Sequence, residues 1–313
     1  MQIFGISAYL FFACIYFSMV AKFNPIFAIA TMFALTQILG LISGILLMTT
    51  AAYDENVQAL SVSPIEDSNS PLNALLLIVY VLVGAGMALL VMKYFRTKLI
   101  FRFLELGVVG GTVSILIFSF IFALTSLDFL ASISISILLG GAFALAKFAL
   151  PRLKNTAAIL SSAGVAAMFG FSMGFWPALL FIVALSLYDY IAVFKTKHML
   201  TLAQGLSTNE LSFTVTASEP QKTHAHEAPH APQEVSRLDL GSGDLAVPAI
   251  LAVSAYPVFG LFGSLATVIG SILSIIITLH FVVKYRIVLP ALPPICLGSL
   301  IALLISQLLV MVF

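Results

Sequence analysis

Long apolar runs separated by short polar stretches make up most of the chain. Ten such runs occur, and each comes close to or exceeds the roughly 20 residues that cross a bilayer as a helix. They cover residues 3–22, 25–51, 71–94, 103–125, 129–150, 156–173, 175–194, 242–259, 262–283 and 289–312. Backbone amides and carbonyls cannot stay unpaired in lipid, so the runs are expected to be helices. The pattern predicts an all-α polytopic membrane protein.

Composition supports this class. The chain is 61% hydrophobic and 9% charged, whereas soluble domains carry about 25% charged residues. A formal charge of +1 gives no sign of a nucleic-acid partner. The expected surroundings are therefore the lipid bilayer of the cell membrane, crossed many times.

The charges are distributed unevenly between the loops. All 14 lysines and arginines lie in or near the loops that follow the odd-numbered runs. The other loops contain only acidic charges, namely Asp54, Glu55, Glu66, Asp67 and Asp128. Because basic loops stay in the cytoplasm, the long polar stretch at residues 195–240 is expected there. Ten spans then place both termini, including the C-terminus, outside.

The polar stretch divides the chain. It is rich in Thr, Ser, Glu, Pro, Gln and His, so we expect a flexible loop without a packed core. The expected organisation is a separate N-terminal helix at 1–24, a membrane core at 25–194, the cytoplasmic loop at 195–240 and a second part of the core at 241–313.

Two aspartates lie inside apolar sequence on either side of that loop. A carboxylate at membrane depth costs at least a few kcal/mol, which marks Asp189 and Asp244 as a candidate functional site. Asp189 lies six residues before Lys195, about 9 Å from the cytoplasmic edge of a helix. Asp244 lies seven residues after Arg237, at most about 10 Å deep. The two side chains can therefore face each other.

The sequence around Asp244 predicts a loosened helix start. Gly241 and Gly243 allow close backbone approach, and Pro248 is expected to distort the next turn. Irregular backbone at this depth is tolerated where it lines a water-accessible pocket.

Paired carboxylates favour two kinds of function. A pair that shares one proton supplies a general base for water and an acid for the leaving group, without a cofactor or metal. Membrane aspartates also relay protons or cations in transporters, and depth and spacing alone do not separate these alternatives. A non-catalytic scaffold for membrane helices is a third, weaker alternative.

Three motifs resemble a known family, the presenilin and signal peptide peptidase group of intramembrane aspartyl proteases. They are Tyr188-Asp189, Gly241-Ser242-Gly243-Asp244 and Pro290-Ala291-Leu292, in that order. The resemblance covers runs two to ten. It implies a nine-helix presenilin-like core, with residues 1–24 as an extra N-terminal helix.

The resemblance also implies roles for single residues. Asp189 and Asp244 are similar to the catalytic pair of the family, with Tyr188, Gly241 and Gly243 shaping the site. The other three, Pro290, Ala291 and Leu292, would pack beside the pair and engage an extended substrate. Expected substrates are single-span membrane proteins or signal and remnant peptides, with no cofactor and no partner subunit required.

Two further patterns concern packing. Glu105 follows Arg102 by three residues, a spacing that predicts an ion pair along one helix. Small-xxx-small spacings, which favour close helix packing, occur at Gly40/Gly44, Gly107/Gly111 and Gly170/Gly174.

Overall fold

The computed structural model describes residues 25–65, 67–94, 98–191, 214–218, 237–285 and 289–312. The expected N-terminal helix at 1–24 and most of the expected loop at 195–240 lie outside the described residues. The long helices are α2 (Pro25–Ala51), α4 (Pro71–Tyr94), α5 (Lys98–Leu124), α6 (Phe129–Ala149), α7 (Lys154–Ser172), α8 (Phe175–Ile191), α10 (Ser242–Tyr285) and α11 (Leu292–Val312). The short elements are α3 (Glu55–Gln58), the 3₁₀ turn η1 (Pro151–Leu153) and the strands β1 (Thr214–Ser218) and β2 (Arg237–Gly241).

The helix ends agree with the apolar runs to within a few residues. Pro25 and Pro71 open α2 and α4, where a fixed φ suits the first turn and the missing N–H costs no helical bond. The 3₁₀ turn η1 begins at Pro151 and links α6 to α7. Local sequence therefore decides where these helices begin.

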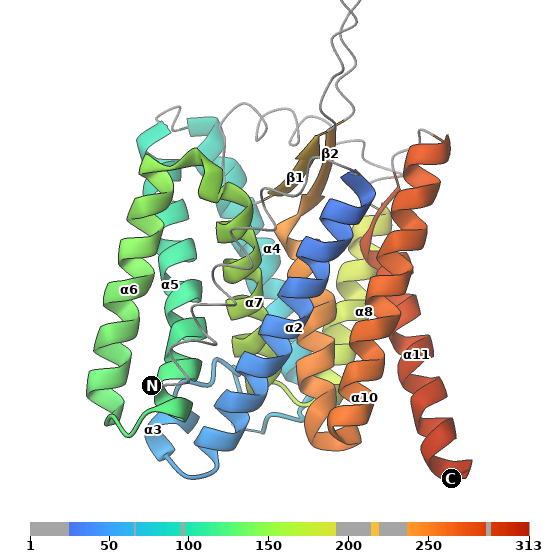
Figure 1. Ribbon diagram of the computed structural model, residues 1–313, viewed down its shortest axis with the longest axis horizontal. Helices are drawn as coiled ribbons and strands as arrows, with labels where there is room; N and C mark the ends of the chain where they lie inside the picture. Colours follow the sequence, from blue (N-terminus) through green and yellow to red (C-terminus); the bar gives the residue numbers. More distant parts are fainter. Residues whose placement is uncertain are drawn as a thin grey trace, which may run out of the picture.

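Helix α10 is 44 residues long, but it does not run straight. Gly260 has φ 64° and ψ −171°, a left-handed backbone region that favours glycine. The chain reverses there, and the two arms of α10 run side by side (Figure 1). The two separate runs predicted at 242–259 and 262–283 are thus confirmed.

The described residues contain six helices long and apolar enough to cross a membrane, and two shorter apolar helices, Pro71–Gly84 and Phe175–Ile191. Because α10 counts once among the six and crosses twice, nine segments form the described bundle. The predicted nine-helix, all-α membrane fold is confirmed.

The first arm of α10 forms the centre of the bundle. It packs against α2, α7 and α8, and every residue from Leu245 to Ala255 is buried. Glycines permit the close approach: a Cβ at Gly44 would lie 2.4 Å from Val253. Helices α5 and α6 pair with each other at one side, and α4 packs mainly on α8 (Figure 1).

Strands β1 and β2 form an antiparallel pair at one end of the bundle, at the start of α10 (Figure 1). Their register runs from Thr214 opposite Gly241 to Ser218 opposite Arg237. Sequence reasoning missed both strands, because they lie in the polar stretch that was expected to be a flexible loop. Asn155 of α7 fastens β1 through hydrogen bonds to the backbone N–H and C=O of Thr216, at 3.2 and 2.9 Å.

The charge pattern agrees with the arrangement of the helices. Lys147 and Lys284 lie in the last turns of α6 and α10, and Arg152 lies in η1. These helix ends lie at the same end of the bundle as the strands, while α3 and the C-terminus lie at the opposite end (Figure 1). The loops that alternate in charge therefore also alternate in space.

Candidate active site

Asp189 lies in the last turns of α8 and is 8% exposed. The backbone N–H of Leu292 donates a hydrogen bond to its Oδ2 atom at 3.4 Å. Leu292 is the first residue of α11, where helical amides have no partner within the helix. The last of the three motifs thus reaches the first carboxylate through its main chain.

Asp244 lies in the first turn of α10, directly after β2. A Cβ built at Gly241 would lie 3.3 Å from its Oδ2 atom, so a larger residue there would crowd the carboxylate. Gly243 is exposed, and a Cβ there would meet nothing within 4 Å. A helix N-terminus carries partial positive charge, which suits an acidic side chain in this turn.

The fold brings the two carboxylates together from different helices. Asp189 and Asp244 lie close enough to interact electrostatically, and the buried thiol of Cys296 in α11 lies near both. Leu292 and Cys296 belong to a buried apolar cluster that also contains Val247. Two like charges beside an apolar wall favour sharing a proton over double ionisation.

The remaining predicted residues differ in how far they are buried. Pro290 is buried and Ala291 half-buried, and both directly precede α11. Tyr188 is 52% exposed, because neighbouring positions on a helix point in different directions and Asp189 points inward. The structure does not bring the Tyr188 side chain into the buried cluster.

The turn expected to be distorted at Pro248 is regular. Within α10 only Gly260 departs from helical backbone angles, so the expected distortion is wrong. A proline near a helix start removes just one hydrogen bond, the one that the carbonyl of Asp244 would accept.

Two buried polar side chains near Asp244 were missed. Gln37 of α2 is 0% exposed and donates from Nε2 to the carbonyl of Leu245 at 2.9 Å. Ser162 of α7 donates from Oγ to the carbonyl of Ser242 at 3.1 Å. For Gln37 the signal was present in the sequence, since an amide side chain is rare in an apolar run such as 25–51.

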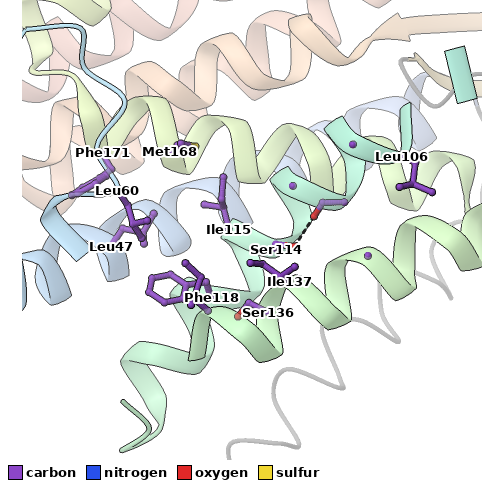
Figure 2. A pocket seen from close by; sticks show the side chains of 15 residues that line it. Leu47, Leu60, Leu106, Ser114, Ile115, Phe118, Ser136, Ile137, Met168 and Phe171 are labelled. Atoms are coloured by element: carbon purple, nitrogen blue, oxygen red, sulfur yellow. Dashed lines mark hydrogen bonds between the residues drawn. The ribbon is translucent and has the colours of Figure 1, made fainter. Parts of the chain in front are cut away.

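A separate apolar cavity of about 400 Å³ lies between α5, α6 and α7. Leu106, Ile137 and Met168 line it, and Ser114 turns its hydroxyl to the carbonyl of Gly110 at 2.7 Å (Figure 2). Neither aspartate lines this cavity, so it does not belong to the candidate active site.

Glu105, at the same side of the bundle, forms a buried ion pair with Lys147 of α6. The ion pair predicted from spacing was with Arg102 on its own helix, and Arg102 is exposed. The structure instead links α5 to α6. Among the described residues, no group of three His, Cys, Asp or Glu side chains is placed to hold a metal ion.

Comparisons with known proteins agree with this fold. A crystal structure of a presenilin family intramembrane aspartate protease in space group C222 matches with a TM-score of 0.65 and 23% identity, covering 91% of this chain and 100% of the other. A second, in space group P2, matches with a TM-score of 0.60 and 24% identity, covering 88% and 96%. At such identity the likeness establishes the fold alone.

No match was found among curated proteins. The profile of the family described as "Signal-peptide peptidase, presenilin aspartyl protease" matches residues 30–312, which is most of the chain. The chain therefore belongs to the signal-peptide peptidase and presenilin family of intramembrane aspartyl proteases, which hydrolyse peptide bonds.

Proposed function

We propose that the protein cleaves peptide bonds of transmembrane helices with Asp189 and Asp244 as the catalytic pair. The observation that carries this proposal is the meeting of two membrane-depth carboxylates, one of them held by the amide of Leu292. Tyr188, Gly241, Gly243, Pro290 and Ala291 would shape the surroundings of the pair.

In the proposed mechanism, the pair holds one proton. The ionised carboxylate takes a proton from a water molecule, whose oxygen attacks the scissile carbonyl carbon. The protonated carboxyl polarises the carbonyl oxygen. When the tetrahedral intermediate collapses, the C–N bond breaks and a carboxyl group delivers a proton to the leaving amine. Products are a carboxylic acid and an amine, and the pair ends with one proton again.

A helical substrate must first expose its carbonyl groups, which are engaged in i to i+4 hydrogen bonds. The strand pair offers a partner for the opened chain. Because both main-chain groups of Thr216 bind Asn155, Thr216 and Asp239 form a pair without hydrogen bonds to each other. By alternation, Arg237, Asp239 and Gly241 turn their backbone groups away from β1. An extended substrate segment paired with this outer edge of β2 would end beside Asp244.

This pairing gives a testable consequence for the substrate. Glycines placed near the cut should speed cleavage, because they lower the cost of unwinding the substrate helix. A glycine scan through a single-span substrate, read by product formation, measures this. A flat scan would count against strand pairing.

Suitable substrates are single-span membrane proteins or signal and remnant peptides, and no partner subunit is required. The direct test uses the purified chain alone in detergent with a single-span substrate. We expect Asp189→Asn and Asp244→Asn each to lower the cleavage rate about 10³-fold or more. The control is Asp128→Asn, which removes an acidic residue from the opposite end of the bundle, before α6.

Other outcomes of this experiment are informative. Cleavage that persists in both active-site variants would reject the pair. Intact substrate with all four folded proteins would favour transport, and proton flux into vesicles would then be measured.

We also propose that this is a protein of the cell membrane, with the 195–240 loop in the cytoplasm and the C-terminus outside. The separation of basic from acidic helix ends supports this orientation. Substrates would then have an outside N-terminus. Labelling of single cysteines from the outside of intact cells tests the orientation. Preferential cleavage of a reversed substrate would contradict the substrate preference.

A further inference from the structure

The turn that carries Asp244 is weak as an isolated piece of chain. Gly243 precedes Asp244 and is the residue type with the most backbone freedom, and nothing lies within 4 Å of where its Cβ would be. Pro248 has no N–H, so the carbonyl of Asp244 lacks the usual donor four residues later. A carboxylate on such a turn would move with its backbone.

Two side chains from other helices hold this turn from outside. The carbonyl of Ser242 accepts from Ser162 of α7 at 3.1 Å, and the carbonyl of Leu245 accepts from Gln37 of α2 at 2.9 Å. The two fastened carbonyls lie on either side of Asp244 in the chain. The turn is thus tied to α2 and α7, two of the helices that pack against α10.

Gln37 makes this bond at a cost. Its side chain is 0% exposed, and its Oε1 atom has no hydrogen-bond partner. The orientation is fixed by chemistry, since a backbone carbonyl only accepts and so must face the NH₂ end of the amide. A buried acceptor without a partner destabilises a fold. An apolar side chain of the same length would avoid that penalty.

We propose that Gln37, assisted by Ser162, is a positioning residue that fixes the backbone on both sides of Asp244 and thereby its carboxylate. This inference rests on the proposed function and assigns to it a residue that touches neither substrate nor the reacting atoms. Gln37 does not serve to stabilise the fold. It fixes the position of the Asp244 carboxylate relative to Asp189.

The test compares Gln37→Met with wild type, because methionine matches glutamine in length but offers neither donor nor orphan acceptor. We expect kcat to fall about 10- to 100-fold, as for a misplaced catalytic group, with KM changed less than about twofold. The melting temperature should stay equal or rise, because the unpaired acceptor is gone. Ser162→Ala, a smaller change at the other carbonyl, should lower kcat in the same sense.

The matched control is Ser43→Ala. Ser43 is also fully buried on α2, but its hydrogen bond goes to Ser119 of α5 at 2.6 Å and not to the first turn of α10. This variant should lower the melting temperature and leave kcat unchanged. The proposal is overturned if Gln37→Met keeps kcat, or if its loss of activity only follows a loss of folded protein.

A second measurement separates this inference from the proposed function. Hydrogen exchange of the amides at 243–247 should be faster in Gln37→Met than in wild type and unchanged in Ser43→Ala. If the folded wild type does not cleave the substrate, the proposed function is wrong. Hydrogen exchange alone then tests the positioning role of Gln37. Unchanged exchange in Gln37→Met would then overturn the positioning role.

Discussion

The helices around the two aspartates and the α5–α6 pair are built differently. In α7, which packs on the first arm of α10, 72% of the membrane-length segment is buried, whereas in α6 the value is 22%. Around the aspartates, small residues bring backbones together and side chains bind main-chain carbonyls. Between α5 and α6, Phe129 packs on Phe118 and Phe122, and a buried ion pair and the close approach at Gly140 also hold the helices.

The difference shows that one sequence pattern can have two uses. Gly40, Gly44 and Gly170 receive neighbouring residues at close range, with Val253 filling the space beside two of them. Gly107 and Gly111 meet nothing within 4 Å of where their Cβ atoms would lie. The α5–α6 pair itself contains both kinds of glycine, because a Cβ at Gly140 of α6 would lie 2.7 Å from the backbone oxygen of Gly110 and 2.8 Å from the backbone nitrogen of Ser114 in α5.

The largest expected effect comes from breaking the ion pair between α5 and α6. Glu105→Gln should lower the free energy of unfolding by about 3–5 kcal/mol, because it leaves the charge of Lys147 buried without its partner. Replacing both residues by leucine should recover most of that loss. Denaturant unfolding in detergent measures both.

Arg102→Gln is the control for this prediction. Arg102 is exposed, so the change should stay within about 0.5 kcal/mol. A cost for Arg102→Gln as large as that for Glu105→Gln would contradict the pairing of Glu105 with Lys147.

An intermediate effect compares two glycines. In Gly170→Ala, the added Cβ would lie 2.4 Å from the Cβ of Val253, and crowding should cost about 1–3 kcal/mol. In Gly107→Ala, the added Cβ meets open space, so stability should be unchanged or rise by about 0.5–1 kcal/mol through helix propensity. The melting temperatures of the two variants test this prediction. Equal losses would contradict the difference in packing between Gly170 and Gly107.

The smallest effect lies within the site. Gly241→Ala would crowd the carboxylate of Asp244 at 3.3 Å, and we expect kcat to fall about tenfold, or 1.4 kcal/mol, through displacement of that group. Gly243→Ala should leave the melting temperature unchanged, because its Cβ enters open space. Full activity of Gly241→Ala would show that the carboxylate adapts.

Much of the fold could be predicted from the sequence, because length and apolarity decide locally whether a segment crosses lipid. The ends of α2 and α4, the reversal near Gly260 and the separation of charged loops all follow from neighbouring residues. The strands could not be predicted, because β1 depends on Asn155, which lies 61 residues away from Thr216.

The site divides in the same way. The sequence by itself predicted two carboxylates at similar depth near the same end of adjacent spans, and it marked them as a candidate site because lipid makes unpaired charge costly. Only the tertiary structure decided which groups surround them. The amide of Leu292 reaches Asp189 across 103 residues, and Gln37 reaches the turn of Asp244 across 208. Such contacts depend on how helices pack, and periodicity along the chain carries no information about a partner so far away.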